Sequence, residues 1–198
     1  MNVGFDFTGH IERLCRDMIV RLPELRHIDM DRVGVGFRQT RRAVSHGMFA
    51  SLTPLRFHAG SLLTKRRGRD WTIQRVYDRD GREMLYILNF YLPRFQNLSW
   101  REKLITVIHE LWHVGTQFDG DLRRHEGRCY AHGSSKSEYD EQMGVLVDEW
   151  LAHDPPDSLH AFLQDDFHHL HSAHGGIFGR SFPRVKLIPA NSAGRTCD

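Results

Sequence analysis

The sequence of 198 residues predicts an α+β protein in which a small, twisted, mostly antiparallel sheet packs against a helix, with a helical C-terminal part. Three observations support this class. Apolar residues follow the helical period near the N-terminus, strand-like runs fill residues 33–92, and helical periodicity returns from Trp100. The length fits about one domain, so we expect residues 1–198 to form one unit with a core at about 30–153 and an irregular tail at 175–198.

The composition argues against several classes of protein. Hydrophobic residues at 40% and charged residues at 26% indicate a soluble folded chain rather than a disordered one. The formal charge of +2 is too close to neutral to favour a nucleic-acid or membrane partner. Cys15, Cys129 and Cys197 are odd in number and widely spaced, which does not indicate a disulfide framework. No leader and no membrane-length apolar run is visible, so we expect a cytoplasmic protein.

The first half of the chain begins with a helix and continues as strands. Residues 10–22 carry apolar side chains at helical spacing and are followed by Pro23. Four strand-like runs come next, at residues 33–37, 47–57, 71–77 and 84–92. The last two runs flank Asp78-Arg79-Asp80-Gly81, and this Asp-Gly step predicts that they form a hairpin.

The second half is predicted to be helical. Ser99 and Glu102 have the three-residue spacing of a capping box, which predicts a helix starting at Trp100 and ending near Gly115. Apolar residues at helical spacing predict further helices at about 137–153 and 158–170. From Gly175 onward, glycine and proline predict an irregular segment that wraps the surface.

The stretch TVIHELWHVG, residues 106–115, carries the chemistry. On a helix, His109 and His113 lie one turn apart on one face, where both imidazoles can bind the same metal ion. Glu110 then lies beside the metal, where its carboxylate can hold a water. The composition gives only about 0.05 such motifs by chance, which disfavours a helix that is merely rich in histidine. One zinc ion is the default, because imidazole ligands suit zinc and its catalytic sites keep an open position.

Two ligands do not complete such a site, so a third must come from elsewhere in the chain. Thr116 and Asp119 stand where a metzincin has glycine and histidine, which excludes that subclass. Histidines and acids downstream of the motif remain open as the third ligand: His125, His132, Glu138, Asp140, Glu141 and Glu149.

The segment HELWHVGTQFDGDLRRHEGRCY resembles the small HExxH metallopeptidases of phages and bacteria and, more distantly, the SprT-type and minimal zincin proteases. That family has H-E-L-x-H, a turn with D-G and L-R, then H-[D/E], with an aromatic residue five positions after that histidine. The matching positions are His109, Glu110, Leu111, His113, Asp119, Gly120, Leu122, Arg123, His125, Glu126 and Tyr130. The likeness covers about residues 84–151.

The resemblance implies a zincin-like fold, zinc ligation by His109, His113 and His125, and Glu110 as the catalytic base. Gly127-Arg128-Cys129 departs from the more acidic stretch of the family, which leaves His132 as a rival ligand or a transition-state donor.

These features predict a zinc-dependent metallopeptidase in which Glu110 acts as general base on a metal-activated water that attacks a peptide or protein substrate. Tyr130, His132 and Tyr139 are candidates for stabilising the oxyanion, although either tyrosine can equally serve packing. We expect the substrate to lie as an extra strand along a sheet edge, at residues 84–90. The alternative is that this strand belongs to the core.

Two other functions stay open: a non-catalytic module that zinc stabilises, and a DNA-associated protease of SprT type. Glu110 argues against the first, because a structural metal site needs no base. The weak net charge and the lack of a second zinc motif argue against the second. We expect the basic run at residues 65–70 to be solvated. His168, His171 and His174 are the candidates for a second metal site, but no cysteine or acid lies at fitting spacing.

Overall fold

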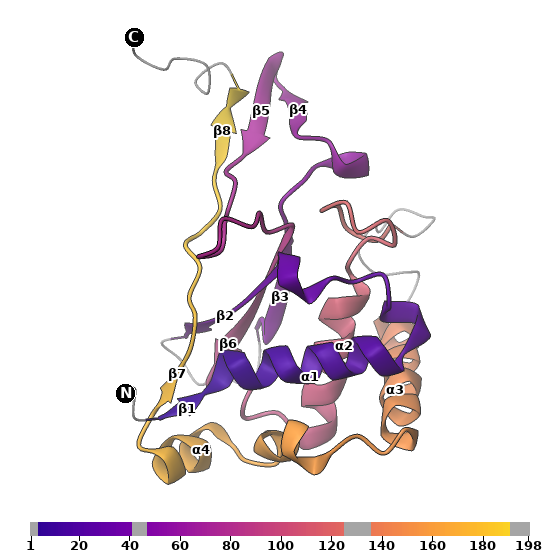
Figure 1. The fold of residues 1–198 in the computed structure, drawn as a ribbon, viewed down its shortest axis with the longest axis vertical. Helices are drawn as coiled ribbons and strands as arrows, with labels where there is room; N and C mark the ends of the chain where they lie inside the picture. The colour runs from indigo at the N-terminus through magenta and orange to yellow at the C-terminus, as the bar shows by residue number, and fades with distance from the viewer. Residues whose placement is uncertain (1–3, 41–46, 125–135, 191–198) are drawn as a thin grey trace.

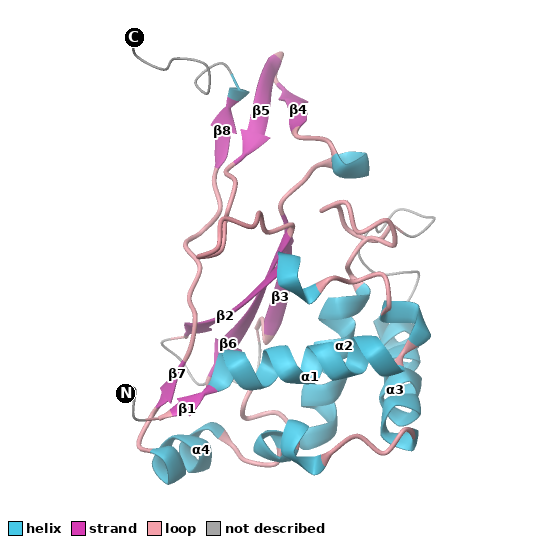
Figure 2. Cartoon of the chain, viewed as in Figure 1, coloured by secondary structure: helices cyan, strands magenta, loops and turns pink. Residues whose placement is uncertain are grey.

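The computed structural model describes residues 4–40, 47–124 and 136–190, with only the backbone described at 136–140. The architecture is α+β, as predicted, with the helices gathered at one end of the molecule and a small sheet at the other (Figures 1 and 2). In chain order the helices and strands are β1 (Phe5–Asp6), α1 (Phe7–Arg21), β2 (Val33–Gln39), β3 (Ala50–Pro54), β4 (Leu63–Arg66), β5 (Arg69–Ile73), β6 (Tyr86–Leu92), α2 (Trp100–Trp112), α3 (Lys136–Ala152), α4 (Phe167–His174), β7 (Ile177–Phe178) and β8 (Leu187–Pro189).

The central sheet has the strand order β2-β6-β3. Strand β6 is antiparallel to β3 but parallel to β2, so the sheet is mixed rather than mostly antiparallel as predicted. The prediction was wrong because β6 inserts between two strands that precede it in the chain. All but one residue of β6 are buried, which is typical of a central strand.

The predicted hairpin between residues 71–77 and 84–92 forms only at its turn. The Asp78 N–H donates to the Arg82 carbonyl at 2.9 Å, Gly81 has φ +78°, and a single bridge joins Tyr77 to Glu83. Beyond the next hydrogen bond, from the Met84 N–H to the Val76 carbonyl at 2.9 Å, the strands separate, because both sides of β6 are already paired with β2 and β3. Strand β5 instead joins a second sheet, ordered β4-β5-β8.

The C-terminal part differs from the predicted helix at 158–170. Two short 3₁₀ turns, Asp157–Leu159 and Ala161–Leu163, precede α4, which starts only at Phe167. The side chain of Asp166 caps α4 by accepting the His169 N–H at 2.7 Å, and this cap fixes the late start.

The tail predicted to be irregular contributes two strands. Strand β7 pairs with β1 in parallel, and β8 pairs with β5. Between them the chain runs along the molecule (Figure 1), and Phe182 packs on the sheet beside Gly34. A Cβ atom at Gly34 would lie 2.7 Å from the Phe182 ring, so this position requires glycine.

The main core lies between the central sheet and the helices. Helix α1 starts three residues earlier than predicted, because the Asp6 side chain accepts the Gly9 N–H at 3.0 Å. Phe7 then makes edge-to-face contacts with three core aromatics, Phe37, Phe90 and Phe95. In the described part of the chain, none of the helices has both the length and the apolar character needed to cross a membrane.

Lys103 ties the start of α2 to the C-terminal part. It is 1% exposed, and its Nζ donates to the carbonyls of Leu163 at 2.8 Å and Asp165 at 2.7 Å. Burial lowers the pKa of Lys103 to about 8, with Asp165 and Asp166 opposing that shift. The ammonium group is therefore charged at neutral pH although it is out of water.

This burial predicts a pH-dependent stability. The folded-state pKa lies below the ordinary value of 10.5, so the penalty for the buried charge is fully present below pH 8 and is relieved as the pH rises toward 10.5. Between about pH 7.5 and pH 9.5, Lys103 should add about 2 kcal/mol to the free energy of unfolding. Urea denaturation at both pH values should show this gain in the wild type and not in Lys103→Met. An equal change in the free energy of unfolding between the two pH values in both proteins would contradict the prediction.

Candidate functional site

Helix α2 places the histidine motif beside the sheet. The predicted capping box is present, with the Ser99 side chain accepting the Glu102 N–H and Glu102 accepting the Ser99 N–H at 2.9 Å. The buried face of the helix packs into the core through Leu104, Val107, Ile108 and Leu111. His109 and Glu110 lie in the last turn, and His113 is the C-cap residue with helical dihedral angles.

The two imidazoles converge. The Nε2 atoms of His109 and His113 are 3.0 Å apart, with ring centroids separated by 4.7 Å and ring planes inclined by 80°. Two nitrogens bound to one tetrahedral zinc ion lie about 3.3–3.4 Å apart, given bond lengths of about 2.0–2.1 Å. The pair therefore fits a shared metal ion with only a small adjustment.

No third side chain that would complete a metal site with His109 and His113 is found among the described residues. Within residues 4–40, 47–124 and 141–190, no three histidine, cysteine or acidic side chains are grouped to hold a metal. His125, Tyr130 and His132 lie outside the described residues, as do the side chains of Glu138, Tyr139 and Asp140. Glu141, Glu149 and the α4 histidines His168, His171 and His174 are described, and none belongs to a three-ligand group in that part of the chain.

Glu110 is buried beside the histidine pair. Its side chain is 8% exposed, and the backbone N–H of Leu52 donates a hydrogen bond to its carboxylate. Burial raises the pKa of Glu110 to about 7, and the Leu52 N–H opposes part of that rise by stabilising the charged form. The sheet thus holds the carboxylate from the side opposite to its own helix.

The contact with Leu52 identifies β3 as the edge strand at the site. Phe49 accepts the Tyr91 N–H, and the Leu55 N–H donates to the carbonyl of Leu85, the residue before β6. The alternation of an antiparallel ladder therefore turns the N–H and C=O of Leu52 away from β6. The prediction that residues 84–90 form an open edge was wrong, because β6 is paired on both sides. The alternative, that this strand belongs to the core, is confirmed.

Immediately after α2 the chain reverses, as expected from the residues following the motif. Val114 and Leu122 form an antiparallel bridge, and the Gly115 N–H donates to the Asp121 carbonyl at 3.1 Å. The Arg123 N–H then donates to the carbonyl of His113 at 2.8 Å. The Arg123 guanidinium also lies over the Trp112 ring, 4.0 Å from its centroid. These contacts bring the chain back to the histidine pair.

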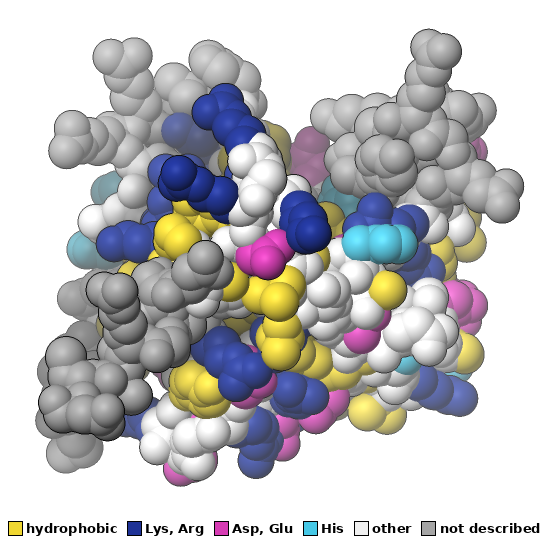
Figure 3. Space-filling model, turned by 90° about the horizontal axis from the view of Figure 1, so that it is seen from above, with side chains coloured by type: hydrophobic (Ala, Val, Ile, Leu, Met, Phe, Trp, Pro, Cys, Tyr) yellow, Lys and Arg dark blue, Asp and Glu magenta, His cyan; other side chains and the backbone are white. Residues whose placement is uncertain are grey.

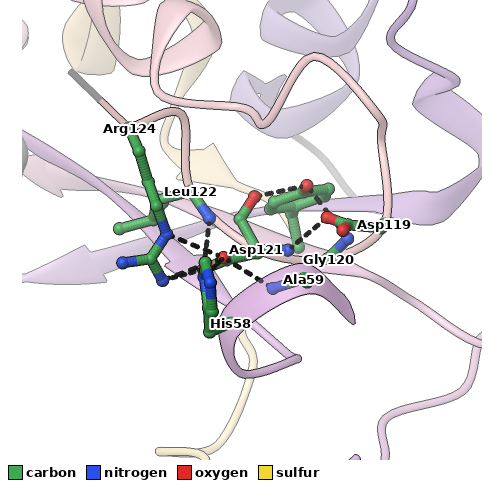
Figure 4. A network of polar contacts seen from close by, with 8 residues as sticks. His58, Ala59, Asp119, Gly120, Asp121, Leu122 and Arg124 are labelled. Carbon is green, nitrogen blue, oxygen red and sulfur yellow. Dashed lines mark hydrogen bonds and ion pairs between the residues drawn. The ribbon is translucent and has the colours of Figure 1, made fainter. Parts of the chain in front are cut away.

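Asp121 holds this return loop, and no sequence pattern marked it as a candidate site residue. Figure 4 shows its carboxylate between the 58–60 turn and the end of the loop. It accepts the Ala59 N–H at 3.1 Å and pairs with the Arg124 guanidinium at 2.9 Å, while His58 lies 3.5 Å away. A neighbouring cavity of about 640 Å³ is lined by the loop and by Trp112 and Gln142. Asp121 thereby fixes Arg124, the residue before His125.

Tyr86 anchors the same loop from the central strand. Its hydroxyl donates to the Asp121 carbonyl at 2.7 Å and accepts the Gly120 N–H at 3.0 Å. Burial raises the pKa of Tyr86 to about 12, so the phenol keeps its proton. Gly120 has φ +90°, a conformation that favours glycine, and this gives the Asp119-Gly120 step a structural reason.

Comparison with known proteins adds one finding. The model of a family described as "Putative phage metallopeptidase" matches residues 8–150. The match includes all but the first residue of α1, the central sheet, α2 and all but the last two residues of α3. No curated protein and no solved structure matches the chain.

The close approach at Gly115 gives a test of the return loop. A Cβ atom there would lie 2.6 Å from the Asp121 carbonyl oxygen. Gly115→Ala should therefore displace the loop, lower the free energy of unfolding by about 1–3 kcal/mol and weaken zinc binding at least about tenfold. Chemical denaturation and competition with a chromogenic chelator measure the two effects.

Gly144→Ala is the matched control. Gly144 lies within α3, and a Cβ atom there would come no closer than 3.7 Å to the Arg101 side chain. Alanine should stabilise this helix by up to about 1 kcal/mol without changing zinc affinity. If Gly115→Ala behaves like this control, the return loop does not position the histidine pair.

Proposed function

Because the chain belongs to the phage metallopeptidase family, we propose that it hydrolyses peptide bonds with one zinc ion bound by His109, His113 and His125. The family description implies a metal and a peptide substrate. The observation that carries the proposal is the convergence of two Nε2 atoms to 3.0 Å beside the buried carboxylate of Glu110. A structural zinc site has no use for that carboxylate, since Glu110 is not needed as a ligand.

His125 is our choice for the third ligand on grounds of reach. The Arg123 N–H is bonded to the His113 carbonyl, and His125 follows two residues later, a span of at most about 7 Å. Arg124 is held by Asp121, which limits the directions in which the chain can leave. His132, Glu138 and Asp140 are the remaining rivals, and they are separated from this anchor by more residues. Glu141 and Glu149 are described and form no three-ligand group with the histidine pair.

The chain's own residues would act as follows. When bound, zinc would polarise the substrate carbonyl and acidify a water. Glu110 would accept a proton from the attacking water and deliver it to the leaving amine. The Leu52 N–H would hold the carboxylate in one orientation during both transfers. Tyr130, His132 and Tyr139 are the candidates for hydrogen bonding to the oxyanion.

We propose that the substrate binds along β3. This strand has β6 on one side only, and the alternation of the ladder directs the carbonyls of Ala50, Leu52 and Pro54 to the other side. An extended peptide added there would pass beside Glu110, because Leu52 contacts both the edge and that carboxylate. An edge strand next to the metal-binding helix is the arrangement expected of a zincin-like fold.

Replacing the base tests the mechanism. Glu110→Gln should retain zinc and fold but lose about 10²–10⁴-fold in peptide hydrolysis, because no group remains to accept the proton of the attacking water. The assay uses a broad peptide library and measures zinc content in the same samples. Equal rates for the two proteins would refute the role of Glu110. A wild type that binds zinc and cleaves nothing would favour the non-catalytic module.

Replacing each histidine tests the ligand set. His125→Ala should bind zinc at least about a hundredfold more weakly than the wild type, whereas His132→Ala should bind it nearly as well. The measurement is zinc stoichiometry by elemental analysis after dialysis against a weak chelator, with circular dichroism to monitor the fold. Loss of zinc from His132→Ala alone would transfer the ligand role to His132.

A further inference from the structure

The second sheet has two unlike faces. Pairing places Thr64 opposite Trp71 and Arg66 opposite Arg69 between β4 and β5, and Trp71 opposite Pro189 between β5 and β8. Residues directly opposite one another share a face of a sheet. We call this surface the arginine face, and it comprises Thr64, Arg66, Arg69, Trp71, Ile73, Leu187 and Pro189.

Charge is balanced on one face of this sheet and unbalanced on the other. On the opposite face, Lys65 stands across from Asp70, so the two charges compensate. On the arginine face, Arg66 stands across from Arg69, and like charges directly opposite one another destabilise a sheet. Within the described part of the chain, no ion pair links either arginine to an acid. This arrangement does not serve the stability of the hairpin.

The turn between β4 and β5 adds a third arginine in a conformation that arginine disfavours. Arg67 and Gly68 have φ +50° and +73°, the pattern of a two-residue type I′ turn. Asparagine, aspartate or glycine is preferred at the first of these positions, because a positive φ brings the Cβ atom of other residues too close to the backbone. Arg67 is exposed, so packing does not explain its presence.

These three arginines surround a hollow beside an indole ring. A cavity of about 690 Å³ is lined by Arg66, Arg67, Arg69, Trp71 and Leu187. Figure 3 views the molecule from this end and shows Lys and Arg side chains gathered beside hydrophobic ones. The cavity therefore combines guanidinium groups with a partly exposed aromatic surface.

We propose that the arginine face, together with Arg67, binds single-stranded nucleic acid. Guanidinium groups match phosphate geometry in two-point contacts, and a base can stack on Trp71. An acidic protein surface would pair with the guanidinium groups but would leave the indole ring of Trp71 without a contact. The sequence alone predicts that the basic run at residues 65–70 is solvated. The structure adds three observations that favour binding: Arg66 lies opposite Arg69, Arg67 has a positive φ, and the arginines line a cavity. The proposal concerns a surface separate from the metal pair, so it does not depend on hydrolysis.

The test measures binding of a fluorescein-labelled single-stranded oligonucleotide of about 20 nucleotides by fluorescence anisotropy at several salt concentrations. With three phosphate contacts, log K should fall with log[salt] with a slope of about −2. Arg66→Ser/Arg69→Ser should bind at least about tenfold more weakly and reduce the slope to about −0.7. Arg13→Ser/Arg26→Ser removes the same charge from exposed positions elsewhere and should leave affinity and slope nearly unchanged.

A second variant separates binding from structure. Arg67→Asn should weaken binding about threefold or more while raising or preserving the melting temperature, because asparagine suits the turn. If Arg67 had a purely structural role, Arg67→Asn would lower the melting temperature and leave binding unchanged. Trp71→Leu should lose affinity with little change in salt slope.

Three outcomes would overturn the proposal. One is an equal loss of affinity in the Arg13/Arg26 control, which would mean diffuse attraction. Another is polyglutamate binding as tightly as the oligonucleotide, which would assign the face to an acidic protein. The third is tighter binding to phosphatidylserine vesicles with no oligonucleotide binding, which would assign it to a membrane surface.

Discussion

The hydroxyl of Tyr86 connects the centre of the sheet with the loop that follows the motif helix. It is buried on a strand paired on both sides, and it bonds one carbonyl and one N–H of neighbouring loop residues. That loop in turn places the Arg123 N–H on the carbonyl of His113. Because the strand cannot move without breaking two ladders, the phenol gives the loop a fixed reference point. The end of α2, the reversal of the chain and the approach to residue 125 all depend on this contact.

Glu110 is an ionisable side chain at a buried position where it does not stabilise the fold. Glu110 is 8% exposed and receives one backbone hydrogen bond, from Leu52, while burial favours its neutral form. A hydrophobic side chain of similar size would pack there at lower free energy. Lys103, on the same helix, is likewise buried, but its Nζ bonds two carbonyls and thereby joins two parts of the chain. The difference between the two groups supports a functional rather than a structural reason for Glu110.

Local patterns predicted the elements that depend on nearby residues. The capping box at Ser99 and Glu102 fixed the start of α2, and the helical period then placed His109 beside His113. Pairing between distant strands could not be predicted from local patterns. The Asp78–Gly81 turn forms as predicted, but β6 pairs with β2 and β3, and β5 pairs with β4 and β8. The contact of Leu52 with Glu110 was not predictable, since it uses a backbone N–H that no side-chain pattern reveals. Asp121 lies within the segment HELWHVGTQFDGDLRRHEGRCY, but its role is seen only in the structure, where its carboxylate accepts the Ala59 N–H.

The pairing of β1 with β7 has a consequence for the order of events during synthesis. Phe5 pairs with Ile177, and Phe162 packs against both Phe5 and Phe7. The start of α1 therefore lacks these native contacts until nearly all of the described residues have been synthesised. The motif helix has the same dependence through the contacts of Lys103 with residues 163 and 165. Contacts so distant in sequence close large loops and form late. A nascent chain on the ribosome that has emerged only through His113 therefore carries both imidazoles without the framework that aligns them, and the site can form only after residues 163–177 have been made.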